Sequence, residues 1–455
     1  MTNIAKLRSG EAVFSALYET AVGIDVHEKK MVACYQSSLF GDGELKTEHR
    51  DFGTTQQQLE ELTAWCKGLN PDIILFESTG VYWVSLYEKL EQSGLAPDKV
   101  AVLNGRDVKA VRGRKTDWAD AKRLTEIGRY GAFKASFIPS KPIRDLRFMF
   151  RALSALKKEK QRVVNILHKL FTCSGLRASQ VFSDIRGKAA TVIMNAVIAG
   201  VQGAELMKVI KSNCSRLKAS AADIYAALQG DRTSPIWHII KIFSSRYRHT
   251  LEQYQALFEL IEDLIKPYAE TTALLCTVPG IKRTTAMGLV CELGDDLSAF
   301  TSIKHFCSWL GICPGNSESA GKRYSGKCAK GNKYLRTLLI EAAQGVALSK
   351  KGALYEQFQT LKERRGHNRA IVAIAHKLAK IIYAIYRDKT PYKEQTTGQL
   401  KEHRIKRLAR AASSLSEVNL KVRDPIILTD TVTEKPERLI EMSEHKVKLR
   451  RKLSG

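Results

Sequence analysis

Length, composition and charge set the first limits on what this chain can do. It has 455 residues, of which 44% are hydrophobic, enough for roughly two to four folded domains. Its 73 Lys and Arg residues outnumber 47 Asp and Glu, and a net charge of +26 favours a polyanionic partner, above all nucleic acid. Nothing resembles a signal peptide or a run of about 18 apolar residues, so we expect neither secretion nor a membrane span. Nine scattered Cys residues without CxxC spacing argue against disulfides or zinc and indicate a cytoplasmic protein.

Strand and helix patterns alternate in the N-terminal third of the chain, after a 1–19 extension. The first three expected strands are close enough for hairpins, with Gly41–Gly43 as one turn, whereas the later strands need helical crossovers. Residues 20–142 therefore predict an α/β domain with a mixed sheet of the RNase-H-like (RuvC-like) kind. The expected strands cover 20–25, 30–36, 47–52, 72–78 and 99–104, and the expected helices cover 56–69, 82–92 and 117–130.

Four carboxylates stand at the ends of these elements. Asp25 and Glu77 follow apolar strand runs, where an uncompensated charge is costly. Asp117 and Asp120 are three residues apart, so one helical face can present both, although Asp117 could instead cap the helix. Converging at one sheet edge, the four carboxylates would bind one or two Mg²⁺ or Mn²⁺ ions and suit attack at a phosphodiester. His27 could be a further ligand, although a surface position on the strand is the favoured interpretation.

A basic segment precedes these aspartates. Within 104–117 it carries Arg106, Lys109, Arg112, Arg114 and Lys115. Beside a metal site it would bind a nucleic-acid backbone; the alternative is a solvated loop.

The rest of the chain has mostly helical patterns. Residues 143–270 predict a long helical hairpin or coiled coil, serving either as a spacer or in dimerisation or RNA contact. Residues 271–390 predict a compact helical domain that opens with a helix–hairpin–helix-like stretch around Pro279 and Gly280, whose backbone N–H groups could bind a phosphate. Residues 391–455 resemble a partly disordered basic tail.

A second group of candidate catalytic and nucleic-acid-binding residues surrounds Ser319. Small residues here would let a phosphate approach the backbone, and nearby cations would favour a serine nucleophile. A serine in such a Gly/Ser loop is otherwise an ordinary turn residue. Between Gly321 and Arg336 there is no acidic residue and there are six basic ones, namely Lys322, Arg323, Lys327, Lys330, Lys333 and Arg336.

The chain contains five motifs: GIDVHEKK, FESTGVYW, KTDWADAKRL, VPGI and SAGKxxxGxxxKGNKYLR. Together they resemble the DEDD transposases of bacterial insertion sequences. By this resemblance Asp25, Glu77, Asp117 and Asp120 match the metal-binding residues. Ser319 matches the serine that forms a covalent link to DNA, although this chain has Ser319-Ala320-Gly321 where the family usually has Ser-Gly-Gly. Ser317 remains the alternative nucleophile, and residues after 391 depart from the family.

The resemblance also implies partners and a reaction. The protein would be an RNA-guided recombinase, associated with the bacterial nucleoid, that cleaves and rejoins donor and target DNA. A structured guide (bridge) RNA would pair with both DNAs. The protein would form homodimers and then tetramers. In these assemblies the metal cluster of one subunit and the serine of another would together form one active site. A metal-dependent Holliday-junction-type nuclease, or a non-enzymatic nucleic-acid-binding protein, are the competing hypotheses.

Overall fold

The computed structural model describes residues 16–38, 45–78, 80–95, 99–105, 116–315, 317–319, 322–325, 327–394, 426–429, 436–443 and 446–451. The chain divides into two compact units, Met1–Arg144 and Asp145–Gly455. Among the residues described, no helix has the length and apolar character needed to cross a membrane.

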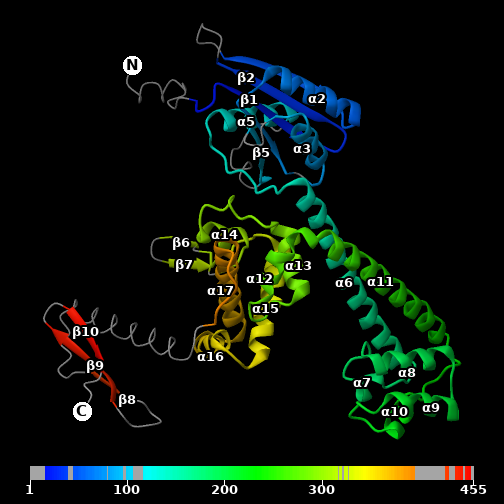
Figure 1. Cartoon of the computed structure of the whole chain (residues 1–455). Helices are drawn as coiled ribbons and strands as arrows, with labels where there is room; N and C mark the ends of the chain where they lie inside the picture. Colours follow the sequence, from blue (N-terminus) through cyan, green and yellow to red (C-terminus); the bar gives the residue numbers. More distant parts are fainter. Residues whose placement is uncertain are drawn as a thin grey trace. The chain divides into compact units, whose positions relative to one another are not determined.

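A mixed sheet forms the centre of the N-terminal unit (Figure 1). Its strand order is β3-β2-β1-β4-β5, with β1–β2 and β2–β3 antiparallel and β1–β4 and β4–β5 parallel. This topology confirms the fold class that the alternating pattern predicts. The strands are β1 (Thr20–Val26), β2 (Met31–Ser37), β3 (Lys46–Phe52), β4 (Ile73–Glu77) and β5 (Val100–Leu103). The turn expected at Gly41–Gly43 lies outside the described residues.

Helices pack on both faces of this sheet because successive strand residues point to opposite sides. On one face Ile24 and Phe76 join a core with residues of α2 (Gln56–Leu69) and α3 (Trp83–Gln92). On the other face Ala21 and Leu75 pack against Leu124 of α5 (Asp117–Arg129). The strand ends at which Asp25 and Glu77 lie are therefore held by two separate cores.

Two long helices of the second unit lie side by side, as the helical hairpin predicts (Figure 1). They are α6 (Lys141–Cys173) and α11 (Ile236–Leu264). Arg246 of α11 forms an ion pair with Glu159 of α6 at 2.6 Å, and the ammonium group of Lys160 lies 4.2 Å from the Tyr254 ring centroid.

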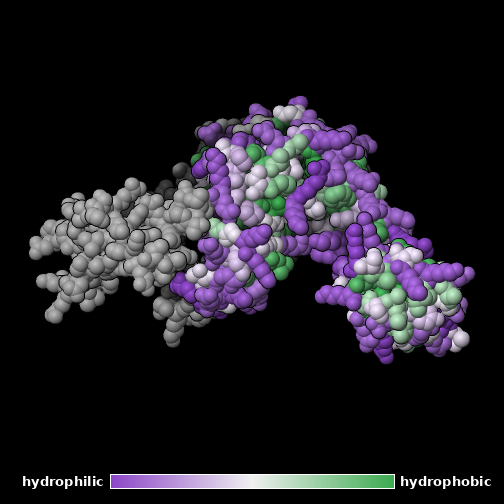
Figure 2. All heavy atoms as spheres, turned by 60° about the horizontal axis from the view of Figure 1, so that its bottom comes forward, coloured by the Kyte–Doolittle hydropathy of each residue, from purple (hydrophilic) through white to green (hydrophobic). Residues whose placement is uncertain are grey.

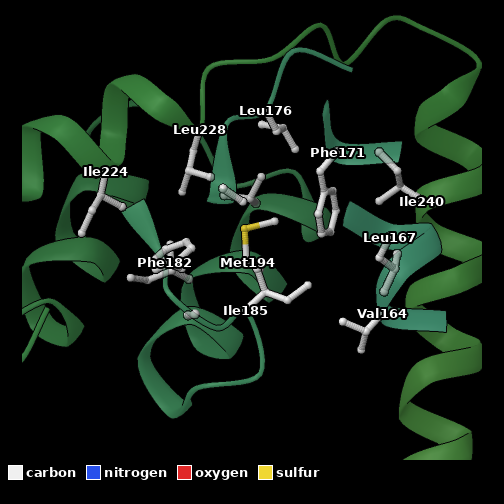
Figure 3. Close-up of a cluster of buried hydrophobic side chains, with 14 of the residues drawn as sticks. Val164, Leu167, Phe171, Leu176, Phe182, Ile185, Met194, Ile224, Leu228 and Ile240 are labelled. Atoms are coloured by element: carbon white, nitrogen blue, oxygen red, sulfur yellow. The ribbon is translucent and has the colours of Figure 1, made fainter. Parts of the chain in front are cut away.

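Four short helices between them form a bundle that the sequence pattern did not predict. Its buried core includes Met194, Phe171, Phe182 and Ile185 (Figure 3). Hydrophilic residues cover most of the face in Figure 2, with apolar side chains gathered over the lobe of this bundle. The helices are α7 (Ala178–Val181), α8 (Lys188–Ala199), α9 (Gly203–Asn213) and α10 (Ala221–Ala227).

The expected compact helical domain follows α11. Its VPGI turn joins α12 to α13, and Gly280 adopts a φ of +85° there, which favours glycine. The elements are η2 (Lys266–Tyr268), α12 (Ala269–Cys276), α13 (Arg283–Leu293), α14 (Ile303–Trp309), β6 (Ser317–Ser319), β7 (Lys322–Ser325), α15 (Lys333–Ser349), α16 (Ala353–Arg365) and α17 (His367–Asp388).

The C-terminal segment differs from the expected basic tail. Three strands, β8 (Ile426–Thr429), β9 (Pro436–Ser443) and β10 (Lys446–Arg451), form an antiparallel sheet in the order β10-β9-β8. Ser443 pairs with Lys446, which is the register of a tight hairpin. Apolar and charged residues alternate only briefly in these strands. The basic, mostly polar composition of the whole segment therefore did not predict them.

Candidate active site

Gly23 brings α5 directly onto β1 and so determines where the candidate site forms. A Cβ atom at Gly23 would lie 2.5 Å from the carbonyl oxygen of Ala121 and 2.6 Å from the hydroxyl of Thr125. Glycine is therefore required for this close approach. Asp25, two residues further along β1, shares the face of Gly23, and the N-terminal turn of α5 carries Asp117 and Asp120.

Asp25, His27 and Asp117 come together at this point. Each offers one ligand atom, and these atoms all lie within 4.8 Å of one another. His27 Nε2 is 2.9 Å from Oδ2 of Asp25 and 3.7 Å from Oδ1 of Asp117. The N-cap of α5 is Thr116, whose hydroxyl accepts a hydrogen bond from the Ala119 amide at 3.2 Å, so Asp117 does not cap the helix.

The electrostatics of the cluster favour a bound cation. Burial raises the pKa of Asp25, the neighbouring His27 lowers it, and the carboxylates of Asp120 and Asp117 raise it further. Asp25 is 16% exposed, so water compensates its charge only in part. Asp120 also forms an ion pair with Arg123 at 3.2 Å. A divalent ion would relieve the repulsion among the three aspartates.

Glu77 lies at the same sheet edge but is not part of the three-residue group. β1 and β4 are parallel and pair Ile24 with Phe76, so Asp25 and Glu77 each stand one residue beyond that pair. The Glu77 carboxylate occupies the space that a Cβ on Gly105 would need. Its side chain must rotate towards Asp25 to share a cation with it.

The donor set fits a divalent metal. Carboxylate oxygens are preferred by Mg²⁺ and Mn²⁺, and an imidazole nitrogen suits transition metals. Asp25, His27 and Asp117 offer the three ligand atoms that lie together, Asp120 follows Asp117 by three residues on α5, and Glu77 lies at the same sheet edge.

An exposed aromatic side chain borders the cluster. Trp118, which follows Asp117, is 47% exposed, and its ring centroid lies 4.7 Å from that of His49 on β3. Burial lowers the pKa of His49, and the nearby Lys122 ammonium lowers it further.

Ser319 lies at the tip of a two-stranded hairpin rather than in an irregular loop. It is the last paired residue of β6 and stands opposite Lys322 of β7, whereas Ser317 pairs with Ser325 nearer the base. Beyond the Ser317–Ser325 pair, at the base of the hairpin, Pro314 forms a β-bridge with Cys328. The Gly315 amide donates a hydrogen bond to the Lys327 carbonyl at 2.9 Å. Of the six basic residues that the sequence places around this serine, Lys322 and Arg323 belong to β7.

The remaining basic candidates divide into three groups. Lys327, Lys330 and Lys333 are exposed between the hairpin and the start of α15. Arg336 is half-buried and donates a hydrogen bond to the Gly311 carbonyl at 3.0 Å, so it also supports the fold. The basic segment that contains Arg106, Lys109, Arg112, Arg114 and Lys115 lies outside the described residues.

A buried ionic cluster anchors the chain just after this hairpin. Glu292 of α13 is fully buried and accepts hydrogen bonds from Arg151 Nε at 2.8 Å and from the Asn332 amide at 2.8 Å. Arg147 Nε lies 3.3 Å from the same carboxylate. Asn332 in turn caps α15 by accepting from the Tyr334 amide at 3.0 Å. The cluster therefore connects α6, α13 and α15 beneath the hairpin stem.

Sequence reasoning ranked one of these contributions second and missed another. His27 is exposed, as expected, and its ring also faces Asp25, because a position two residues later in an extended chain lies on the same face. That spacing was the available signal. Glu292 lies near the end of helix α13, RTTAMGLVCEL, where a lone acidic residue among apolar ones signals a buried partner, but its partners lie far away in the sequence.

Comparison with known proteins gives two family matches in chain order. Residues 22–173 match a DEDD transposase profile of the IS110 type, and residues 272–359 match the profile of the transposase IS116/IS110/IS902 family. The first match contains Asp25, Glu77, Asp117 and Asp120, and the second contains the Ser319 hairpin.

Several relatives span much of the chain. A probable family 20 transposase of Pseudomonas aeruginosa is 25% identical over 335 residues, covering 71% of this chain and 87% of the relative. The pilin gene-inverting protein of Moraxella bovis is 25% identical over 391 residues, covering 82% and 98%. The transposase for insertion sequence element IS1111A of Coxiella burnetii is 29% identical over 159 residues, covering 34% and 43%. From both profiles and these relatives, the chain belongs to the IS110 family of DEDD transposases, enzymes that recombine DNA.

Proposed function

We propose that this transposase cleaves and rejoins donor and target DNA through a phosphoserine link at Ser319, assisted by Mg²⁺ at the DEDD cluster and guided by a structured RNA. The observation that carries the proposal is the cluster itself. Ligand atoms from β1 and α5, far apart in the sequence, lie within 4.8 Å of one another at the edge of a mixed sheet. Neighbouring carboxylates of this kind are costly without a cation.

The N-terminal unit would position the scissile phosphate. Asp25 and Asp117 would hold the cation, Asp120 would add negative charge at the same helix turn, and Glu77 would complete the set after rotating away from Gly105. When bound, Mg²⁺ would polarise the phosphodiester and stabilise charge on the leaving oxygen. The basic segment at 106–115 would bind the adjacent backbone.

The C-terminal unit would supply the nucleophile. The Ser319 hydroxyl oxygen attacks phosphorus, one phosphorus–oxygen bond to the DNA breaks, and the hydroxyl proton ends on the leaving DNA oxygen. The new phosphoserine bond conserves the energy of the broken one, so a DNA hydroxyl can reverse the step and rejoin strands without ATP. Placement at a hairpin tip, with Lys322 opposite and Lys327, Lys330 and Lys333 following, supports Ser319 over Ser317.

Recognition would be divided between protein and RNA. The charge of +26 and the exposed lysines suit backbone binding, which carries no sequence information. Base pairing with a guide RNA would supply sequence choice. We propose that a dimer, and then a tetramer, combines the cluster of one subunit with the serine of another.

The test is detection of a covalent protein–DNA adduct. Full-length protein is incubated with its guide RNA, Mg²⁺ and end-labelled donor DNA, denatured without protease and separated on a gel. Wild type should give a labelled adduct, Ser319→Ala should bind nucleic acid but give none, and Ser317→Ala should retain it. Mixing Ser319→Ala with Asp25→Ala protein should restore part of the adduct if subunits share a site.

Three outcomes would contradict the proposal in different ways. An adduct lost only in Ser317→Ala moves the nucleophile two residues upstream. Metal-dependent cleavage without any adduct would identify the protein as a metal-dependent nuclease instead. Binding without cleavage in every variant and in wild type assigns it to the non-enzymatic alternative.

A further inference from the structure

The imidazole of His27 lies where a third ligand of a cation bound by Asp25 and Asp117 would lie. Its Nε2 atom is 2.9 Å from Asp25 Oδ2 and 3.7 Å from Asp117 Oδ1. In an octahedral shell with bonds of about 2.1 Å, neighbouring ligand atoms are about 3.0 Å apart and opposite ones about 4.2 Å. The first contact is a hydrogen bond whose length also matches the spacing of neighbouring ligands, and the second distance falls between the two values.

The backbone at His27 holds the ring at this edge. The His27 amide donates a hydrogen bond to the Lys30 carbonyl at 3.0 Å and so closes the turn between β1 and β2. The strands on either side are paired up to Val26 and Met31. Only the side-chain torsions of His27 remain to be adjusted, and with 47% of the side chain exposed they have room to adjust.

Charge also favours an imidazole at this place. Asp25 already faces the negative charges of Asp117 and Asp120. Another carboxylate ligand would add to this repulsion, whereas a neutral imidazole adds a donor atom without adding charge. A purely structural His27 would need only its contact with Asp25; this ring lies between carboxylates from two separate elements.

We infer that His27 is a nitrogen ligand of the divalent cation, so that the site favours Mn²⁺ over Mg²⁺ more than an all-oxygen site would. The inference rests on the proposed function, because it takes the carboxylate cluster to be a metal site. Its basis is ligand chemistry: imidazole suits first-row transition metals, and Mg²⁺ strongly prefers oxygen.

The experiment uses Mn²⁺ alone as the probe on the full-length protein. Electron paramagnetic resonance of free Mn²⁺ gives the affinity, and pulsed measurements on frozen samples detect ¹⁴N coupled to bound Mn²⁺. Wild type should show directly coordinated nitrogen, and His27→Gln should lose it. The variant should bind Mn²⁺ about tenfold more weakly, with a clearly smaller change for competing Mg²⁺. His49→Gln, a second histidine of the same sheet, should keep the nitrogen signal.

The outcomes separate this inference from the proposed function. Mn²⁺ that binds in wild type and is lost in Asp25→Ala, but shows no ¹⁴N coupling or keeps it in His27→Gln, overturns the role of His27 and leaves the carboxylate site standing. Mn²⁺ binding that Asp25→Ala does not weaken overturns the metal site, and the role of His27 with it.

Discussion

The backbone N–H of Gly23 donates a hydrogen bond to the hydroxyl of Thr125 across 3.0 Å, and this contact joins the central strand to α5. The same hydroxyl lies 2.9 Å from the carbonyl oxygen of Cys34 on β2. One threonine thus ties the helix to two strands. Because Asp117 and Asp120 lie at the N-terminal end of α5, this contact sets their distance from Asp25.

The close approach at Gly23 predicts that Gly23→Ala moves α5 away from β1. The added methyl group would overlap helix backbone, so we expect a loss of about 1–3 kcal/mol of unfolding free energy. Mn²⁺ affinity should fall as well, because the aspartates separate. Chemical denaturation and metal titration measure the two effects.

A matched control is Gly68→Ala in α2, where no atom lies within 4 Å of the added methyl. It should leave metal affinity unchanged and keep or raise stability, since alanine favours helix by up to about 1 kcal/mol. Equal metal affinity in wild type and Gly23→Ala would show that α5 does not position the site.

Asp25→Asn should separate the stability cost of the cluster from its function. The substitution removes a largely buried charge that faces two other carboxylates, so the metal-free protein should melt at a higher temperature. In wild type, Mn²⁺ at one hundred times its Kd should add about 2.7 kcal/mol, reversed by EDTA. Asp25→Asn should show no such gain and no recombination. A full metal-induced gain in the variant would remove Asp25 from the metal site.

Glu292→Gln should destabilise the C-terminal unit. Arg147 and Arg151 would lose their shared buried carboxylate, and removing one partner of a buried ion pair costs roughly 3–5 kcal/mol. The control is Lys157→Gln, which breaks an exposed pair of α6 with Glu341 and should cost about 0.2–1 kcal/mol. Urea unfolding compares the two; similar small losses would mean that the Glu292 cluster does not hold α6 to α13.

Nucleic-acid binding should weaken steeply with salt. Each phosphate contact releases counterions, so the slope of log affinity against log salt counts the contacts. Lys330→Gln and Lys333→Gln should each reduce that slope by about one. Lys67→Gln, at the end of α2 on the sheet face opposite α5, is the control and should leave it unchanged. Binding that is insensitive to salt would exclude backbone phosphates as the main contact.

Local pattern alone determined the elements that carry the carboxylates. The helix at 56–69 was predicted with the bounds that α2 has, because apolar spacing and a capping threonine at Thr55 encode it within a few residues. In the same way Asp25 and Glu77 could be placed at strand ends and Asp117 at a helix start. The Ser319 segment was found from its basic surroundings, but the β6–β7 hairpin was not, because glycines and serines give little strand signal.

Tertiary packing decided what those elements bring together. Spacing indicates that His27 shares a face with Asp25, but it does not bring Asp117 to the other side of the ring. It also predicts neither the Glu77 carboxylate beside Gly105 nor the two arginines around Glu292. These contacts join residues far apart in the chain, and they depend on how closely α5 approaches β1 and α6 approaches α13. Hydrophobic periodicity specifies which face of an element is buried, whereas distances of a few ångströms between polar groups are set only when two buried faces meet.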